Sequence, residues 1–140
     1  MGRHHLSRKL AVILHADVVG STELVQKNEV IAHQRIRDTF ECFSGIIADY
    51  GGTAHEIRGD ALVAEFARAS DSVCAALAYQ ALNSTLNNEL ADNIQPAVRI
   101  GISLGEVVIA DGTITGAGIV LAQRLEQLCE PGGVIVQGAV

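Results

Sequence analysis

The chain has 140 residues, of which 49% are hydrophobic and 19% are charged, and its formal net charge at pH 7 is −6. This composition supplies the core of one domain and excludes an intrinsically disordered chain. With two Tyr, three Phe and no Trp, the acidic chain lacks the basic stripes and stacking aromatic side chains of nucleic-acid-binding proteins. We therefore expect no nucleic acid partner.

The first elements predicted along the chain are a strand and a long helix. Residues 10–14 are apolar and rich in β-branched side chains, which predicts a buried strand. This run is too short to span a bilayer, so the chain itself predicts no membrane partner. The pattern over 22–50 predicts one helix, with Ser21 or Thr22 as its N-cap. Its apolar stripe recurs at steps of three and four through Ile36, Phe40, Phe43, Ile47 and Tyr50.

A hairpin and a second helix follow. Residues 53–58 and 61–66 are predicted to be two strands, and Gly59-Asp60 between them favours a tight turn. Residues 69–87 carry an apolar pattern with helical spacing.

The C-terminal part of the sequence is predicted to form two strands, a helix and a final strand. Residues 97–104 and 106–110 are strand-like runs on either side of Gly105, residues 117–128 are helical, and residues 134–136 form the last strand. The order is βαββαββαβ. We therefore predict an α+β, ferredoxin-like fold with an antiparallel sheet and helices packed on one face.

Two carboxylates occupy ends of predicted strands. Asp17 lies just past the first strand, and Asp60 lies at the tip of the hairpin. In a βαββ sheet the first strand is commonly beside the hairpin, so the two side chains can face each other. Paired carboxylates suit Mg²⁺, and two such ions can clamp the oxygens of a phosphoryl transfer. On spacing alone, ordinary turn and capping roles explain both residues equally well.

The chain resembles the bacterial class III adenylate/guanylate cyclase domains. The resemblance implies a domain over residues 9–140 that lacks its C-terminal end, preceded by an N-terminal tail over residues 1–8. It is carried by four segments in the same order and spacing: KLAVILHADVVGS (9–21), GGTAHEIRGDALVAEF (51–66), VRIGISLGEV (98–107), and AQRLE (122–126) followed by EPGG (130–133).

This resemblance implies an enzyme that converts ATP or GTP into the 3′,5′-cyclic monophosphate and pyrophosphate for intracellular signalling. Such cyclases act as homodimers with the active site between protomers, and they use two Mg²⁺ or Mn²⁺ ions. The resemblance assigns the ions to Asp17, Asp60 and the Val18 carbonyl, the phosphates to the N–H groups of Val19, Gly20 and Ser21, and charge stabilisation on the α-phosphate to Arg124 of the other protomer.

Three positions correspond to family residues that contact the base or the ribose of the nucleotide. The base-reading positions of the family correspond to Glu56 and Thr113. Glu56 fits the N–H donors of guanine, or else it is a solvated charge. Val120 stands where the family usually has an Asn that orients the ribose. It favours the alternative function of a degenerate pseudo-cyclase that binds nucleotide and dimerises.

Two further residues are expected to have no role in the site. We expect His15 to be packed or solvated and not a ligand, and we expect Arg99 to face solvent.

The cysteines bear on the cellular location. Cys42, Cys74 and Cys129 are odd in number and have no CxxC spacing. We expect reduced thiols packed on buried or half-buried helix faces, and from them a cytoplasmic protein.

Overall fold

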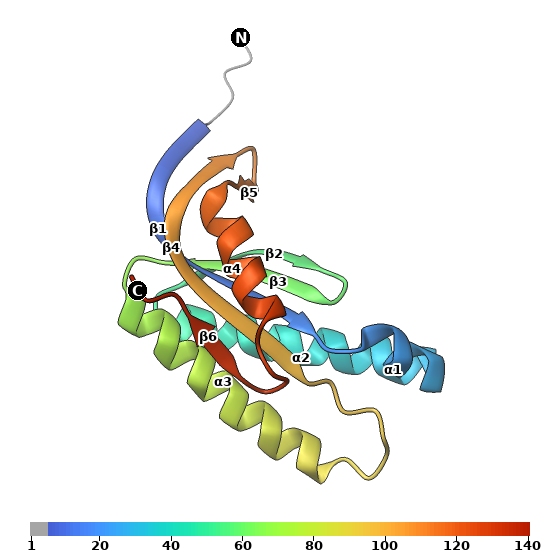
Figure 1. The fold of residues 1–140 in the computed structure, drawn as a ribbon. Coiled ribbons are helices and arrows are strands. Elements are labelled where there is room, and N and C mark those ends of the chain that lie inside the picture. The colour runs from blue at the N-terminus through green and yellow to red at the C-terminus, as the bar shows by residue number, and fades with distance from the viewer. Residues whose placement is uncertain (1–5) are drawn as a thin grey trace.

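The computed structural model describes residues 6–140 (Figure 1). The strands are β1 (Leu6–Val18), β2 (Thr53–Arg58), β3 (Ala61–Phe66), β4 (Val98–Ala110), β5 (Thr113–Thr115) and β6 (Val134–Val136). The helices are α1 (Ser21–Lys27), α2 (Glu29–Asp49), α3 (Ala69–Glu89) and α4 (Ala117–Gln127).

A six-stranded sheet runs through the molecule in the order β2-β3-β1-β4-β5, and β6 pairs with β4 in parallel. The central strands β1 and β4 are antiparallel along their whole length, from Leu6 opposite Ala110 to Val18 opposite Val98. Residues 6–8, which we expected in a tail, therefore belong to β1, because β4 continues far enough to pair with them. Residues 1–5 of that tail lie outside the described residues.

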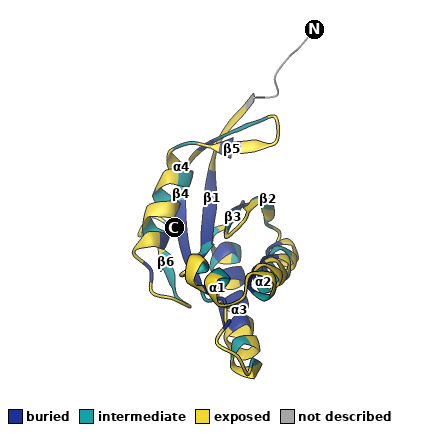
Figure 2. Cartoon of the chain, turned by 90° about the vertical axis from the view of Figure 1, so that its right-hand side faces the viewer, coloured by how far each residue is buried: buried dark blue, intermediate teal, exposed yellow. Residues whose placement is uncertain are grey.

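The larger core lies between the sheet and the helices α2 and α3. From β1, Val12, Leu14 and Ala16 point into it, and all are buried. The rings of Phe43 on α2 and Tyr79 on α3 stack with their centroids 4.0 Å apart. In Figure 2 the central strands are buried, whereas the outer surfaces of the helices are exposed.

Helix α4 covers the opposite face of the sheet (Figure 1). Successive residues of a strand point to opposite faces, so Ala11 and Ile13 of β1 lie in a second core with Ala122 of α4. The helix comes very close to β4: a Cβ atom on Gly101 would lie 2.2 Å from the carbonyl oxygen of Ala122 and 2.4 Å from the backbone nitrogen of Glu126. The predicted α+β ferredoxin-like class is confirmed. The expectation that the helices pack on one face is wrong for α4, which lies on the face opposite α2 and α3.

Two elements have limits in the structure that differ from those predicted from the sequence. The helix expected over 22–50 is divided at Asn28, which has an extended backbone and whose side chain accepts a hydrogen bond from the N–H of Ile31 at 3.1 Å. The strands expected on either side of Gly105 are one strand, and the turn comes later, at Asp111-Gly112, where both φ angles are positive (50° and 80°). At Gly105 the missing side chain makes room for α4, not for a turn.

The cysteines are free thiols with unequal exposure. Cys129 is buried and Cys42 is half-buried, as expected, but Cys74 is exposed because it lies on the outer surface of α3. Within residues 6–140, no helix combines the length and the hydropathy needed to cross a bilayer.

Candidate functional site

The two predicted metal-binding carboxylates belong to neighbouring strand ends. Asp17 is the penultimate residue of β1 and pairs with Ala61 of β3. Asp60 lies in the turn between β2 and β3, and its carbonyl accepts a hydrogen bond from the N–H of Val18 at 2.9 Å. The backbone therefore holds the turn that carries Asp60 beside the end of β1, as the βαββ argument predicted.

The donor set of this pair fits a hard cation. Asp60 is exposed and Asp17 is half-buried, so both carboxylates can be reached from solvent. In the described part of the chain, no three His, Cys, Asp or Glu side chains converge on one metal position. Mg²⁺ keeps several waters and takes one or two carboxylates together with substrate phosphates, so two carboxylates suffice for it. They would not form a closed zinc site.

The turn after β1 is organised around Asp60. Gly20 is the N-cap of α1 with φ 61°, a left-handed conformation that glycine adopts without strain. We expected Ser21 or Thr22 at this position. Ser21 is instead the first helical residue, and its hydroxyl donates to Oδ2 of Asp60 at 2.7 Å.

The backbone donors expected to bind phosphates are only partly available. The N–H of Val18 donates to the carbonyl of Asp60, and that of Val19 donates to the carbonyl of Ala97 at 2.8 Å. The expectation that the Val19 N–H binds phosphate is therefore wrong for this conformation, because that donor closes the backbone pairing at the end of the sheet. The N–H groups of the first turn of α1, beginning at Ser21, have no acceptor within the helix.

An ionic cluster that sequence reasoning missed lies beside Asp17. Arg99 of β4 places Nε 3.4 Å from Oδ1 of Asp17 and Nη2 3.2 Å from Oε2 of Glu126. Glu126 of α4 is fully buried, and its Oε1 lies 3.2 Å from Nδ1 of His15. His15 is packed, as expected, but Arg99 does not face solvent as a free side chain. Its neighbours in β4 point toward α2 and α3, so Arg99 points toward α4.

Burial controls the protonation of this cluster. Burial raises the pKa of Glu126 to about 8, the carboxylate of Asp17 acts in the same direction, and Arg99 opposes both. Burial also lowers the pKa of His15, against the attraction of Asp17. Both side chains thus favour their neutral forms near pH 7, which limits the charge that accumulates beside Asp17.

A bulge in β2 directs the base-reading position toward an open part of the sheet. Ala54 pairs with Ala64, but Glu56 pairs with Val63, so one residue of β2 is unpaired between them. In regular pairing Glu56 would lie opposite Leu62, which points into the larger core. Because of the bulge, Glu56 lies on the face that α4 covers only in part.

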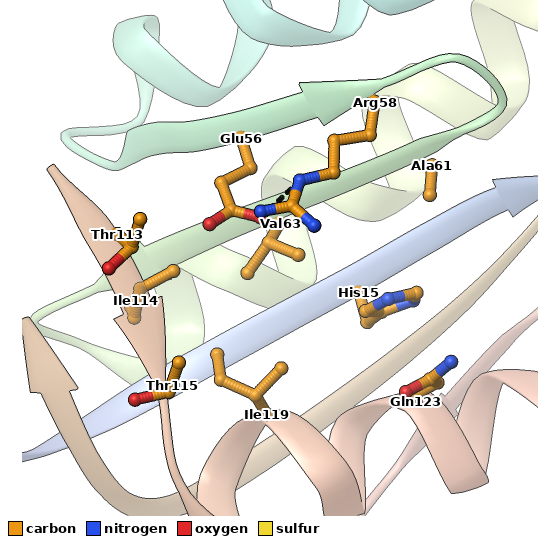
Figure 3. A pocket seen from close by; sticks show the side chains of 10 residues that line it. All are labelled: His15, Glu56, Arg58, Ala61, Val63, Thr113, Ile114, Thr115, Ile119 and Gln123. Carbon is orange, nitrogen blue, oxygen red and sulfur yellow. Dashed lines mark ion pairs between the residues drawn. The ribbon is translucent and has the colours of Figure 1, made fainter.

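Glu56 and Thr113 line the same cavity, of about 450 Å³. Figure 3 shows Glu56 and Arg58 extending from β2 toward this cavity, with Thr113 across it. His15, two residues before Asp17, also lines it. Ser21 and Asp60 line a second cavity, of about 590 Å³, next to α1.

The remaining predicted site residues lie on α4 and point outward. Val120 and Arg124 are one helical turn apart and both are exposed. Within residues 6–140 the guanidinium of Arg124 has no ion-pair or hydrogen-bond partner. The structure thus brings Glu56 and Thr113 together, and Asp17 and Asp60 together, whereas Arg124 is not among the residues that line either of the two cavities.

Comparisons with known proteins identify the family to which the chain belongs. No family model matches the chain. An adenylate cyclase of Streptomyces coelicolor is 30% identical over 96% of this chain and 34% of its own length. A uridylate cyclase of Burkholderia cepacia is 35% identical over 68% of this chain and 40% of its own length. The chain spans less than half the length of the curated relatives it matches.

A solved structure is similar to the chain in both sequence and fold. The crystal structure of an adenylate/guanylate cyclase/hydrolase from Silicibacter pomeroyi is 31% identical, has a TM-score of 0.86, and aligns over 96% of this chain and 79% of that one. On this similarity in sequence and fold, the chain belongs to the class III adenylate/guanylate cyclase family.

Proposed function

We propose that the chain is the catalytic domain of a nucleotidyl cyclase that converts ATP or GTP into the 3′,5′-cyclic monophosphate and pyrophosphate. The observation that carries the proposal is the position of Asp17 and Asp60 at neighbouring strand ends. The cavity that contains Glu56 and Thr113 supports it, since it reaches His15 on the same strand as Asp17. On this proposal, the triphosphate would bind at the strand ends and the base would bind in the cavity.

The metal requirement follows from the donor set. Two Mg²⁺ or Mn²⁺ ions held by Asp17, Asp60 and the Val18 carbonyl would supply Lewis-acid activation of the ribose 3′-hydroxyl and neutralisation of the triphosphate. Ser21 would keep Asp60 oriented through its 2.7 Å hydrogen bond. Arg99 would keep Asp17 oriented from the opposite side.

The reaction is an internal phosphoryl transfer. The ribose 3′-oxygen bonds to the α-phosphorus, the bond from the α-phosphorus to the oxygen that bridges to the β-phosphate breaks, and pyrophosphate leaves. The proton of the 3′-hydroxyl passes to solvent. The N–H groups of the first turn of α1, beginning at Ser21, would donate to phosphate oxygens beside Asp60. Positioning and charge stabilisation of this kind account for most catalysis of phosphoryl transfer.

Arg124 would act in a second protomer. Its side chain is exposed, whereas the buried residues of α4 are Gly118, Ala122 and Glu126. In a two-fold symmetric dimer, α4 of each protomer would cover the site of the other, and Arg124 would stabilise the charge that develops on the α-phosphate. We therefore propose a homodimer with two shared active sites. The free cysteines fit a reaction in the cytoplasm.

A direct assay tests the proposal. The chain is incubated with ATP or with GTP and Mn²⁺, and the cyclic nucleotide and pyrophosphate are quantified by chromatography and mass spectrometry. The control is Asp17→Asn, which keeps the size of the side chain and removes its charge. We expect the wild-type chain to form product at least about 10²-fold faster than this variant. Equal rates for the two proteins would refute the proposal.

Val120 favours a second candidate, a pseudo-cyclase that binds nucleotide and dimerises without turnover. The side chain cannot donate or accept a hydrogen bond, so it cannot orient a ribose hydroxyl. A pseudo-cyclase would show nucleotide-dependent thermal stabilisation but no cyclic product. If Val120 limits the rate, Val120→Asn should raise turnover, by up to about 10²-fold. No change in this variant would remove Val120 as the reason.

A further inference from the structure

We propose that the cavity beside α1 is a second ligand site, which binds a small organic anion that combines a carboxylate with an apolar body. This cavity has a volume of about 590 Å³ and is lined by residues of α1, of α2 and of the hairpin formed by β2 and β3. Binding of the anion does not depend on the cyclase proposal. Its effect on the metal site at Asp60 rests on that proposal.

The two cavities lie on opposite faces of the hairpin. Ile57 lines the cavity beside α1 and pairs with Leu62, which belongs to the larger core. Glu56 lines the other cavity (Figure 3) and pairs with Val63, which belongs to the second core under α4. A ligand beside α1 would therefore not compete with a base bound next to Glu56.

Helix α2 supplies the positive charge of the site. His33 and Arg37 are one helical turn apart, and both are exposed and line the cavity. Of the arginines in the described part of the chain, only Arg37 and Arg124 have no ion-pair or hydrogen-bond partner. A guanidinium binds a carboxylate through two parallel hydrogen bonds. The donors of Arg37 are thus available for the carboxylate of a ligand.

The rest of the lining is largely apolar. It includes Val25 of α1, Ile36 of α2 and Ile57 of β2. Ile57 is 49% exposed, so an apolar group laid against it would remove apolar surface from water, which favours binding. An inorganic anion would leave this surface in contact with water. A cationic group beside an apolar wall therefore favours an organic anion over inorganic phosphate.

The anion would lie next to a predicted metal ligand. Asp60 and Ser21 also line the cavity, and the Ser21 hydroxyl donates to Oδ2 of Asp60 at 2.7 Å. The negative charge of Asp60 opposes the anion, and a divalent cation bound to Asp60 would remove this repulsion. Because coupling between two sites is reciprocal, the anion would then strengthen binding of the cation by the same factor.

The first test measures binding to the chain without metal, by calorimetry and by amide chemical shifts in NMR spectra. The probe is hexanoate. Hexanamide has the same apolar body without the charge, and inorganic phosphate has the charge without the body. We expect a dissociation constant of roughly 1–10 mM for hexanoate, and binding about tenfold weaker for each control. The amide shifts should be largest at Thr22, Val25 and Ile57 and absent at Thr113.

Substitutions separate the two walls of the site. Arg37→Ala should weaken hexanoate binding about tenfold and leave hexanamide binding unchanged. Ile57→Ser should weaken the binding of both, because it removes part of the apolar wall. Arg124→Ala is the matched control, since Arg124 is also exposed and without a partner, and it should bind hexanoate as the wild-type chain does. Equal hexanoate affinity in Arg37→Ala and the wild-type chain, or amide shifts centred on Thr113, would overturn the proposal.

The second test measures the dissociation constant of Mn²⁺ with and without hexanoate. We expect hexanoate to lower this constant about fivefold. Asp60→Asn should bind hexanoate more tightly in the absence of metal and should lose the coupling. An unchanged Mn²⁺ affinity would overturn the coupling while the ligand site stands. Hexanoate binding that depends on Arg37, in a chain that forms no cyclic product, would support the site and count against the cyclase proposal.

Discussion

Replacing Gly101 with alanine tests the close packing of α4 against β4, on which the positions of Glu126 and Arg124 depend. The new Cβ atom would lie 2.2 Å from the carbonyl oxygen of Ala122 and 2.4 Å from the backbone nitrogen of Glu126. Both are backbone atoms, so no side-chain rotation can relieve the overlap, and the helix must move. Overpacking typically costs 1–3 kcal/mol, and we expect a loss of about 3 kcal/mol in the free energy of unfolding.

Urea denaturation followed by circular dichroism measures this loss, and thermal denaturation should show a fall of roughly 10 °C in Tm. Gly45→Ala is the matched control, because a Cβ atom there meets nothing within 4 Å and Gly45 lies inside α2. That variant should be about 0.5–1 kcal/mol more stable than the wild-type chain. A Gly101→Ala protein with wild-type stability would refute the close approach of α4.

Two further predictions concern stability. Asn28→Ala removes the N-cap of α2 and should lower the free energy of unfolding by about 1 kcal/mol in urea denaturation. Asn28→Ser should retain most of the wild-type stability, because serine is also a good N-cap. Equal stabilities of Asn28→Ala and the wild-type chain would contradict the capping role. Burial acts to raise the pKa of Glu65, but hydrogen bonds from Lys9 and His55, at 2.8 and 2.6 Å, hold it below its usual value. Because the folded-state pKa is lowered, this stabilisation is present above the unfolded pKa of about 4.3 and is lost as the pH falls through the folded value. Glu65→Gln should therefore lose less stability than the wild-type chain on acidification below about pH 5, and parallel pH profiles would contradict this reasoning.

Local patterns predicted several elements closely. The strands over 53–58 and 61–66 agree with β2 and β3 residue for residue, because the Gly-Asp turn that separates them is a short-range feature. The break at Asn28 was missed, although Asn is a strong N-cap, because the apolar stripe continues through α1 and α2. Gly105 was misinterpreted as a turn, since only the packing of α4 shows why β4 needs a glycine there.

The site was predicted where it depends on strand ends and missed where it depends on contacts between distant elements. The adjacency of Asp17 and Asp60 follows from a common βαββ topology. The contact of Arg99 with Asp17 and Glu126 could not be predicted, because it requires the face and the register of α4 on the sheet. Alternation along β4 was the only signal that placed Arg99 on the side away from α2 and α3.

Mixing two inactive variants tests the central claim, a nucleotidyl cyclase with shared active sites, most directly. Asp17→Asn damages the metal side of a site, and Arg124→Ala damages the side supplied by the partner. In a mixed two-fold dimer, both defects fall in one site and the other site is intact. We predict little cyclic product from either variant alone and, after subunit exchange at equal concentrations, about a quarter of the wild-type activity. A mixture no more active than the sum of its two components, or wild-type activity in Arg124→Ala alone, would contradict the claim.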